Sequence, residues 1–379
     1  MTTNKNFLEK LLDGAEVEWK KLGDSNFFEI ANSDRKPVKS DLRISGNTPY
    51  YGANNIQDYV DGYTHDGEFV LIAEDGSADL ENYSIQYAKG KFWANNHVHV
   101  VRGKCDANTR FLYHYLKTFN FIPFLSSLER AKLTKGKMVD ISIPIPPIDV
   151  QAEIVRILDK FTELTAELTT ELTTELTARK KQYAYYREQL LTFKEGEVEW
   201  KKLGEVTKYE QPTQYLVSTT NYNDQFKIPV LTAGKTFILG YTDEVIGVYE
   251  GSKKPVIIFD DFTTANKWVN FDFKAKSSAM KMIKSSDENR FVLKYIYYWL
   301  NTLPSDLVDG DHKRQWISNY CNKKIPIPPL EEQARIVAIL DKFDTLVNSI
   351  TEGLPYEIEL RQKQYEYYRD MLLNFPRSA

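Results

Sequence analysis

The stretch from Asp149 to Phe193 contains neither Gly nor Pro, so nothing in it interrupts a helix. Its apolar residues recur every three or four positions, which places them on one side of that helix. At 1.5 Å per residue, a helix of this length spans roughly 65 Å. A helix that exceeds a small domain and carries one apolar stripe needs a partner helix along most of its length.

The same chain supplies the partner, because Glu331–Phe375 repeats much of this stretch. Ile157–Phe161 (ILDKF) returns as Ile339–Phe343, and Lys181–Tyr183 (KQY) returns as Lys363–Tyr365, with the same offset along the chain in both cases. Between its matching ends the second copy contains Gly353, Leu354 and Pro355. Since Pro inside a helix breaks or kinks it, we expect two helices there rather than one.

Four tetrapeptides, TELT, AELT, TELT and TELT, follow one another inside the first stretch. Four residues turn a helix by about 400°, so equivalent side chains drift by about 40° per unit. A repeat with a unit of four residues is more typical of a spacer than of a binding site. The leucines of the predicted spacer helix are Leu164, Leu168, Leu172 and Leu176.

The duplication extends to the whole chain. Glu16–Gly23 (EVEWKKLG) returns as Glu197–Gly204, and each copy ends its variable segment at an IPIPP junction, Ile143–Pro147 or Ile325–Pro329. We therefore predict an α+β protein with a pseudo-twofold internal repeat, in which two mixed α/β domains alternate with two long helices that pack on each other. The predicted parts are residues 1–148 (first domain), 149–195 (first spacer helix), 196–330 (second domain) and 331–379 (second spacer helix).

The variable segments match only in short runs. Val70–Ile72, which precedes Glu74 and Asp75, resembles Val256–Ile258, which precedes Asp260 and Asp261. Arg110-Phe111-Leu112 likewise resembles Arg290-Phe291-Val292 before a helix-like run. The long helices of the two copies are nearly identical, whereas the variable segments have diverged. This pattern suggests that the two variable domains recognise two different targets at a fixed separation.

Composition limits the class of protein. The chain is 42% hydrophobic and 27% charged, values typical of a soluble globular protein, and no apolar run is long enough for a membrane span or a signal peptide. Cys105 and Cys321 are the two cysteines, which suggests a reduced, cytoplasmic protein. The net charge of −4 counts against a purely electrostatic nucleic-acid binder but leaves a local basic face open.

The WKKLG starts, the proline junctions, the LDKF helices, the KQYxYYR helix ends and the Thr-Glu-Leu repeat together resemble the specificity subunit of type I restriction–modification systems. The resemblance covers the whole chain. It implies two target recognition domains that each read one half of an asymmetric bipartite site in double-stranded DNA. It also implies that the two mixed α/β domains are separated by two long antiparallel coiled-coil helices. These helices would set the spacer and dock two methyltransferase subunits and two restriction subunits.

The resemblance further implies a subunit without catalytic residues or a cofactor of its own. S-adenosylmethionine, Mg and ATP are then expected on the partner subunits, whose adenine-N6 methyltransferase and endonuclease activities require this chain. The alternative is a DNA-independent coiled-coil scaffold with protein-binding heads. The acidic net charge favours that alternative, whereas the pseudo-twofold duplication with diverged domains favours duplex DNA.

Polar and basic clusters in both variable segments are the candidate DNA contacts. Basic residues precede the proline junction in both copies, and this matching position favours a DNA-facing loop. Arg and Gln can bond base edges, whereas Lys mostly meets phosphates. The candidates are Arg130, Lys132, Lys135, Lys313, Arg314 and Gln315 before the junctions, with Asn54, Asn55, Asn95, Asn96, Lys235, Thr263, Thr264, Asn266 and Lys267 in turns.

Three motifs that suggest other chemistry are weak. Asp260, Asp261, Asp272 and Lys274 could form a nuclease-type metal site, but short carboxylate patterns arise often by chance. His97 and His99 lack further metal ligands, so we expect no metal site. A phosphate-binding loop ending at Lys235 would need Gly where Pro229 stands.

Overall fold

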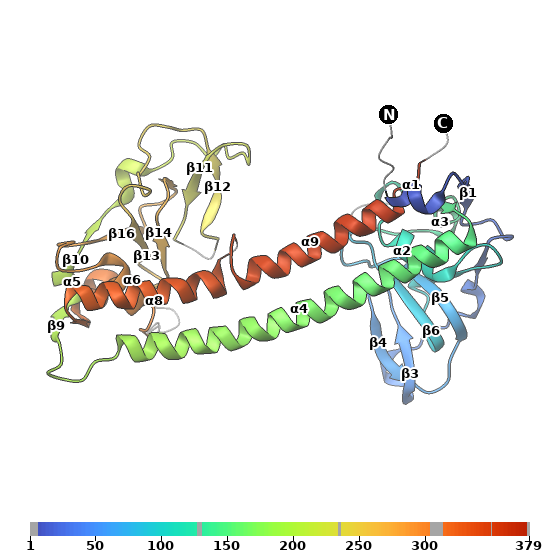
Figure 1. Cartoon of the computed structure of the whole chain (residues 1–379), viewed down its shortest axis with the longest axis horizontal. Coiled ribbons are helices and arrows are strands. Elements are labelled where there is room, and N and C mark those ends of the chain that lie inside the picture. Colours follow the sequence, from blue (N-terminus) through green and yellow to red (C-terminus); the bar gives the residue numbers. More distant parts are fainter. Residues whose placement is uncertain (1–6, 127–130, 234–235, 304–313, 350, 377–379) are drawn as a thin grey trace. The chain divides into compact units, whose positions relative to one another are not determined.

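The computed structural model describes residues 7–126, 131–233, 236–303, 314–349 and 351–376. They form two compact units (Figure 1). Unit 1 takes the chain up to Glu171 and again from Ile358 onward, and unit 2 takes Leu172–Glu357. The long helix α4 (Ile148–Leu191) contributes residues to both units, as the uninterrupted helical pattern predicts.

Unit 1 is built around a six-stranded sheet in the order β2-β7-β5-β6-β3-β4. Its neighbouring strands are antiparallel except for β3 and β6, which run parallel. α2 (Thr109–Leu116) packs on this sheet, and its Leu112 and Leu116 share a core with Val70 and Ile72. The strands are β2 (Phe28–Ile30), β3 (Ser45–Tyr51), β4 (Ile56–Val60), β5 (His65–Ala73), β6 (Ile85–Ala94) and β7 (Val98–Gly103).

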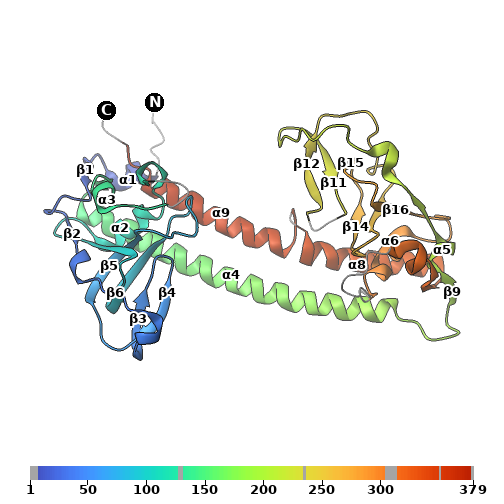
Figure 2. The same ribbon diagram turned by 180° about the vertical axis from the view of Figure 1, so that it is seen from behind.

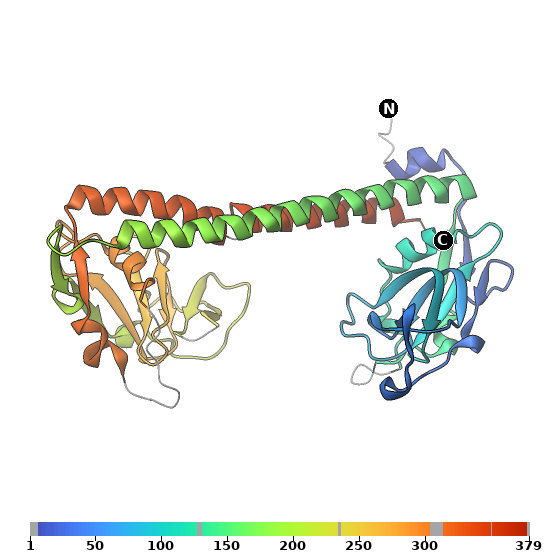
Figure 3. The same ribbon diagram turned by 90° about the horizontal axis from the view of Figure 1, so that it is seen from below.

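Shorter elements complete unit 1. β1 (Glu18–Lys21) pairs with β8 (Ser142–Ile145), so the WKK start lies against the proline junction of the same copy. The sheet lies to one side of the helices of its unit (Figure 3). The remaining elements are α1 (Phe7–Leu12), η1 (Asn32–Asp34), η2 (Ser40–Leu42), η3 (Ile122–Phe124) and α3 (Lys135–Met138).

Unit 2 divides its strands between a four-stranded sheet, β10-β16-β13-β14, and a three-stranded sheet, β12-β11-β15 (Figure 2). β9 (Glu199–Lys202) pairs with β17 (Lys324–Ile327), which repeats the β1–β8 arrangement. The other strands are β10 (Thr207–Glu210), β11 (Ile228–Leu231), β12 (Ile238–Thr242), β13 (Val256–Asp260), β14 (Asn266–Val269), β15 (Lys274–Ala275) and β16 (Met280–Ser285). The short helices are α5 (Leu203–Val206), η4 (Pro212–Tyr215), α6 (Leu293–Leu300), α7 (Gln315–Ser318) and η5 (Tyr320–Asn322).

Strand pairing fixes which residues of the two units are equivalent. Ile72 pairs with His99 between β5 and β7, and Phe259 pairs with Lys281 between β13 and β16. Val70 and Ile72 face the core with α2, just as Ile257 and Phe259 face the core with α6. The sequence match of Val70–Ile72 with Val256–Ile258 is therefore wrong by one residue, and a slip of one residue exchanges the two faces of a strand.

Each unit contains an antiparallel helix pair. In unit 1 the start of α4 packs against the end of α9 (Leu354–Leu373), where the rings of Phe161 and Tyr368 stack with centroids 5.4 Å apart. In unit 2 the end of α4 packs against α8 (Leu330–Asn348), where Tyr186 stacks on Phe343 at 5.5 Å. The two mixed-sheet domains and the packed long helices confirm the predicted fold class.

The predicted break in the second spacer helix is confirmed, since α8 ends at Asn348 and α9 begins at Leu354. Gly353 adopts a φ of +82°, and a Cβ at this position would lie 2.5 Å from the carbonyl oxygen of Thr345. Only Gly fits this left-handed, crowded position without a shift of the backbone.

The tetrapeptide repeat is helical throughout, but its leucines are not deeply buried. Leu164 and Leu168 are each 40% exposed, while Leu172 and Leu176 are half-buried. Thr170 and Thr177 donate their hydroxyls to the carbonyl oxygens of the residues four positions earlier, so these side chains satisfy themselves locally. The repeat thus forms a helix with a thin apolar seam. Within the described residues, none of the helices combines the length and apolar character needed to cross a membrane.

Candidate nucleic-acid interface

A buried glutamine joins each sheet domain to its helix. In unit 1, Gln151 Nε2 donates to the carbonyl oxygens of Asp106 and Pro146, and its Oε1 accepts from the backbone N–H of Asn108. Its side chain is fully buried. This one amide therefore satisfies three backbone groups, two just before α2 and one just before α4, and so joins the starts of the two helices.

Unit 2 repeats the same joint. Gln333 Nε2 donates to the carbonyl oxygens of Arg290 and Pro328, and its Oε1 accepts from the N–H of Val292. Asn108 is thus the counterpart of Val292. The sequence match of Arg110 with Arg290 is wrong, because this joint makes Arg110 the counterpart of Lys294.

An aspartate about two turns further along each helix gives a second joint. Asp159 Oδ1 lies 2.8 Å from both Arg110 and His114 of α2. Its counterpart Asp341 lies 2.8 Å from Lys294 and accepts a hydrogen bond of 2.5 Å from Tyr298. Burial raises the pKa of Tyr298, and the hydrogen bond to Asp341 raises it further. Both domains are therefore attached to their helices by the same two contacts.

Four polar segments of unit 1 meet at one place. Asn54 donates to the carbonyl oxygen of Gly76 and accepts from the N–H of Ala78, which ties the turn after β3 to the loop after β5. The N–H of Glu74 donates to the carbonyl oxygen of His97 at 2.8 Å, and the carbonyl oxygen of Glu74 accepts from Leu133 at 2.7 Å. The segments 52–55, 74–78, 95–97 and 131–133 therefore form one surface.

This surface is hollowed. A depression of about 810 Å³ is lined by side chains from all four segments, among them Asn54, Asp75, His97 and Lys132. His97 Nδ1 lies 2.6 Å from Asp75 Oδ1. Sequence-predicted contacts that are far apart in the chain, Asn54 and Lys132, thus line the same hollow.

Glu74 is the charged centre beneath this surface. Its carboxylate lies 2.7 Å from Arg35 and 3.2 Å from the ammonium of Lys132. Burial alone would raise the pKa of Glu74, but the hydrogen bonds from Arg35 and Lys132 and the interaction with His99 outweigh it and lower the pKa. Glu74 therefore remains ionised at neutral pH.

Unit 2 brings together a turn and a loop end. Asp260 Oδ1 accepts from the N–H groups of Phe262 and Thr263, which shapes the turn between β13 and β14. The carbonyl oxygen of Asp261 accepts from the N–H of Gln315 at 2.8 Å, and its Oδ1 accepts from the N–H of Trp316 at 2.8 Å. Two of the predicted clusters, the turn at 263–267 and the segment at 314–315, therefore lie side by side.

The predicted contacts separate into three groups. Exposed candidates are Asn54, Asn55, Asn96, Lys132, Lys135, Thr263, Lys267 and Arg314. Asn95, Thr264 and Gln315 are buried, and Asn266 is half-buried, with its Oδ1 accepting from Asn301. Arg130, Lys235 and Lys313 lie outside the described residues.

The nuclease-type constellation is not assembled. Asp272 Oδ1 accepts from the hydroxyl of Ser252, and Lys274 Nζ lies 2.7 Å from Glu244. Asp261 is paired instead with Lys281. Across the ranges that the structure describes, no three His, Cys, Asp or Glu side chains are grouped as metal ligands would be.

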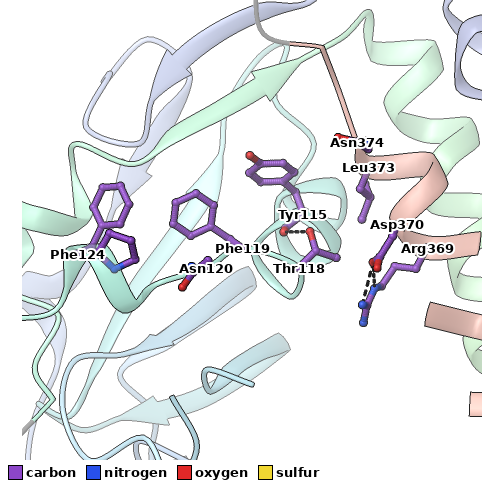
Figure 4. A pocket seen from close by; sticks show the side chains of 10 residues that line it. Tyr115, Thr118, Phe119, Asn120, Phe124, Arg369, Asp370, Leu373 and Asn374 are labelled. Carbon is purple, nitrogen blue, oxygen red and sulfur yellow. Dashed lines mark hydrogen bonds and ion pairs between the residues drawn. The ribbon is translucent and has the colours of Figure 1, made fainter. Parts of the chain in front are cut away.

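A second hollow, of about 530 Å³, lies in unit 1 between the end of α2 and the end of α9 (Figure 4). Tyr115, Phe119 and Phe124 line one side, and Arg369 and Asp370, which pair at 2.8 Å, line the other. It adjoins the joint between domain and helix rather than the polar loops.

The sequence did not predict that Glu74 is the charged residue beneath the hollowed surface of unit 1. It also did not predict that His99 on β7 and Lys281 on β16 are equivalent residues next to an acid in each unit. The available signal was the constant offset between the copies, which relates His99 to Lys281 just as it relates the two helices. The signal was weak because His and Lys look unrelated and the surrounding strands differ in every residue.

Comparisons with known proteins give one consistent result. The model of a family described as the type I restriction modification DNA specificity domain matches residues 16–178 and again 195–360, once in each copy. A Haemophilus influenzae protein described as a putative type I restriction enzyme specificity subunit is 52% identical over 389 residues, covering 99% of this chain and 100% of that protein.

A second relative and one solved structure agree. The specificity subunit of an Escherichia coli type I restriction enzyme is 65% identical over 186 residues, covering 47% of this chain and 45% of that protein. The crystal structure of an M. genitalium type I restriction–modification S subunit matches with a TM-score of 0.56 at 14% identity, covering 100% of this chain and 99% of that one. The shared architecture therefore persists where sequence similarity is low.

Proposed function

The chain belongs to the type I restriction–modification DNA specificity family, and from this premise we propose which of its parts read DNA and which set the distance between them. As a specificity subunit it is the non-catalytic component of the system. The scaffold alternative, with heads that bind only proteins, is not the function of this family.

We assign residues 1–148 and 196–330 to two target recognition domains and residues 149–195 and 331–379 to two spacer segments. The assignment of DNA recognition to both domains rests above all on Lys132 and Arg314, which are both exposed. The residue after each of them donates its N–H to a carbonyl oxygen that directly follows the central strand of the same domain. The two domains differ in their surfaces, but each carries one exposed cation at the equivalent position. This combination fits a bipartite DNA site whose two halves differ in sequence.

Within this assignment, the exposed polar residues have separate roles. Arg314 and Lys132 can each bond the edge of a guanine, whereas Lys135 and Lys267 suit phosphates. Asn54 already uses its amide to hold the loop after β5, so it shapes the surface rather than reading a base. The negative net charge then requires that DNA is bound through local patches rather than through the whole surface.

The spacer segments are proposed to dock two methyltransferase subunits and two restriction subunits. The supporting observation is that exposed aromatic residues repeat on both helix pairs: Tyr185 is 59% exposed, and its counterpart Tyr367 is 62% exposed. An apolar patch that occurs twice suits two copies of one partner. S-adenosylmethionine, Mg and ATP would be bound by those partners.

Co-purification with a candidate methyltransferase, followed by mapping of methylated bases, tests this proposal. We expect methylation at two short half-sites separated by a fixed number of unspecified base pairs. The chain mixed with DNA in a salt titration should lose affinity steeply, because phosphate contacts release counterions. Methylation of one continuous motif, or binding that is insensitive to salt, would contradict the assignment.

A further inference from the structure

In both recognition domains, an acid that directly follows the central strand lies near a buried, nitrogen-bearing side chain of the neighbouring strand. In unit 1, Glu74 follows β5 and lies 3.7 Å from Nδ1 of the fully buried His99 on β7. In unit 2, Asp261 follows β13 and lies 3.6 Å from Nζ of Lys281 on β16, with both residues 1% exposed. The strand registers make Glu74 the counterpart of Asp261 and His99 the counterpart of Lys281.

In both units this arrangement holds the end of a loop. The N–H of Leu133 donates to the carbonyl oxygen of Glu74, and the carbonyl oxygen of Leu133 accepts from His99 Nε2, each at 2.7 Å. A carbonyl only accepts, so Nε2 carries the proton. The N–H of Gln315 donates to the carbonyl oxygen of Asp261 at 2.8 Å. Leu133 and Gln315 are therefore equivalent, and the offset between them is the one that relates His99 to Lys281.

The residue before each held position is the exposed cation. Lys132 precedes Leu133, and its Nζ lies 3.2 Å from Glu74 Oε1. Arg314 precedes Gln315, and Trp316, which comes next, donates its N–H to Asp261 Oδ1. Each acid thus fixes the backbone on which one exposed cation is carried.

Stability alone does not account for the pair in unit 2. Within the described part of the chain, the buried Asp261 Oδ2 accepts no hydrogen bond, and 3.6 Å to Lys281 exceeds hydrogen-bonding distance. A buried ion pair of this kind is often no more stabilising than apolar residues of the same volume. Asp261 is thus kept in an imperfect environment, and an acid also stands at the equivalent place in the otherwise diverged unit 1, which points to a task in recognition.

We propose that Glu74 and Asp261 are positioning residues for DNA recognition, each acting through the loop end that carries Lys132 or Arg314. The proposal rests on the assignment of the two domains to two half-sites. It adds that one acid in each domain, directly after the central strand, sets the accuracy with which that domain reads its own half-site.

The test uses the full chain assembled with its methyltransferase and DNA substrates that vary one half-site at a time. The variants Glu74→Gln and Asp261→Asn keep the size of each side chain but remove its charge. We expect Glu74→Gln to reduce discrimination at one half-site roughly 3- to 30-fold, as for a residue that acts through another, and to leave the other half-site unchanged. Asp261→Asn should affect only the other half-site.

Two comparisons make the result specific. Lys132→Ala must affect the same half-site as Glu74→Gln, and the double variant must be no worse than Lys132→Ala alone, because both changes act on one contact. Glu74→Asp, which keeps the charge, should restore part of the discrimination. If Asp261→Asn fails to assemble, Lys281→Gln probes the same pair from its other member.

Matched controls remove an acid elsewhere in the same unit. Glu29 pairs with Arg102 at 2.7 Å, and Glu210 pairs with Lys284 at 2.5 Å. Glu29→Gln and Glu210→Gln should leave discrimination at both half-sites intact. A loss at both half-sites in Glu74→Gln, or equal effects of Glu74→Gln and Glu29→Gln, would overturn the positioning role. If Lys132→Ala and Arg314→Ala also discriminate normally, the underlying loop assignment fails instead.

Discussion

Gln333 Oε1 accepts a hydrogen bond of 2.9 Å from the backbone N–H of Val292, which joins the start of α8 to the turn before α6. Gln151 makes the same contact with Asn108 in the other unit. Because both amides are buried, each replaces water for three backbone groups that would otherwise be unsatisfied. The attachment of domain to helix is therefore repeated, contact for contact, in the two units.

The first prediction concerns this attachment. Gln333→Leu keeps the volume but leaves two carbonyl oxygens and one N–H without partners, so we expect a loss of about 2–4 kcal/mol in the free energy of unfolding. Urea unfolding measures it. Gln189→Leu, at an exposed position of α4, is the control and should change stability by less than about 0.5 kcal/mol. Equal stability of the two variants would mean that the joint is not a stabilising contact.

The second prediction concerns the exposed cations. Arg314→Ala and Lys132→Ala should each flatten the dependence of log affinity on log salt by about one unit, since each removes one positive charge that displaces counterions from the DNA phosphates. Lys160→Ala removes an exposed cation of α4 that pairs with Glu163, and it should leave the slope unchanged. Unchanged slopes and wild-type methylation rates in both loop variants would show that these loops do not face DNA.

A base-reading role for Arg314 has a different signature. Loss of a guanidinium contact with a base edge would relax one position of one half-site, by roughly 1–3 kcal/mol. Loss of a phosphate contact would weaken all sequences alike. Methylation of substrates with single base changes separates the two outcomes.

The third prediction is that the chain alone neither methylates nor cuts DNA. Asp272 and Lys274 are bonded to Ser252 and Glu244 and are not gathered with Asp260 or Asp261. Purified chain incubated with S-adenosylmethionine or with magnesium should therefore leave DNA unchanged. DNA cleavage that disappears in Asp272→Ala would contradict the non-catalytic role.

The fourth prediction concerns acid stability. Lys274 is 3% exposed, and its Nζ lies 2.7 Å from Glu244. The hydrogen bond from Lys274, with those from the N–H groups of Ser218 and Thr219, lowers the pKa of Glu244 to about 2. Because this pKa is lower in the folded state, the stabilisation is complete above about pH 5 and is lost as the pH falls toward 2.

Glu244→Gln should therefore lower stability at pH 7 by about 2–4 kcal/mol, because it leaves the buried ammonium without its counter-charge. Between pH 5 and pH 2 the difference from the wild type should shrink. Urea unfolding across this range measures it. Glu250→Gln, whose partner Lys253 is exposed, is the control and should show little change at any pH. A difference that stays constant with pH would exclude the Glu244 pair as its source.

The sequence predicted those parts of the fold in which the two copies keep a constant offset along the chain. The constant offset between the copies predicted both helix pairs, and Gly353-Leu354-Pro355 predicted the break between α8 and α9, because helix periodicity and helix breakers are local signals. Equivalent residues of the two sheet domains were harder to predict from the sequence. The separation of Glu74 and Asp261 along the chain is larger than the constant offset between the two helices, because the loops between these points differ in length.

Aligning the two copies by residue identity gave wrong equivalences at two places. Arg110 and Arg290 are both followed by Phe, yet the glutamine joints make Lys294 the counterpart of Arg110. Val70 and Val256 are both valines, yet strand pairing makes Ile257 the counterpart of Val70. In both cases the equivalence is fixed by hydrogen bonds between distant segments, which no local pattern contains. For the same reason the sequence proposed Asn95 and Gln315 as DNA contacts, although both are buried.

The fifth prediction concerns the tetrapeptide repeat of α4. Leu164 and Leu168 are 40% exposed, so the repeat packs through a thin seam that can be shortened by one unit without opening a deep core. Removal of Thr170–Thr173 shortens the helix by about 6 Å and rotates its C-terminal part by about 40°. Since DNA rises about 3.4 Å per base pair, this change corresponds to one or two base pairs.

Methylation mapping of this deletion variant beside the wild type, each assembled with the methyltransferase, decides whether α4 sets the distance between the half-sites. No residue of either sheet domain is changed. We expect both proteins to modify the same two half-sites, and the variant to do so across a spacer shorter by one or two base pairs. An unchanged spacer, or altered bases in either half-site, would contradict the claim that two separate domains read DNA at a distance set by α4.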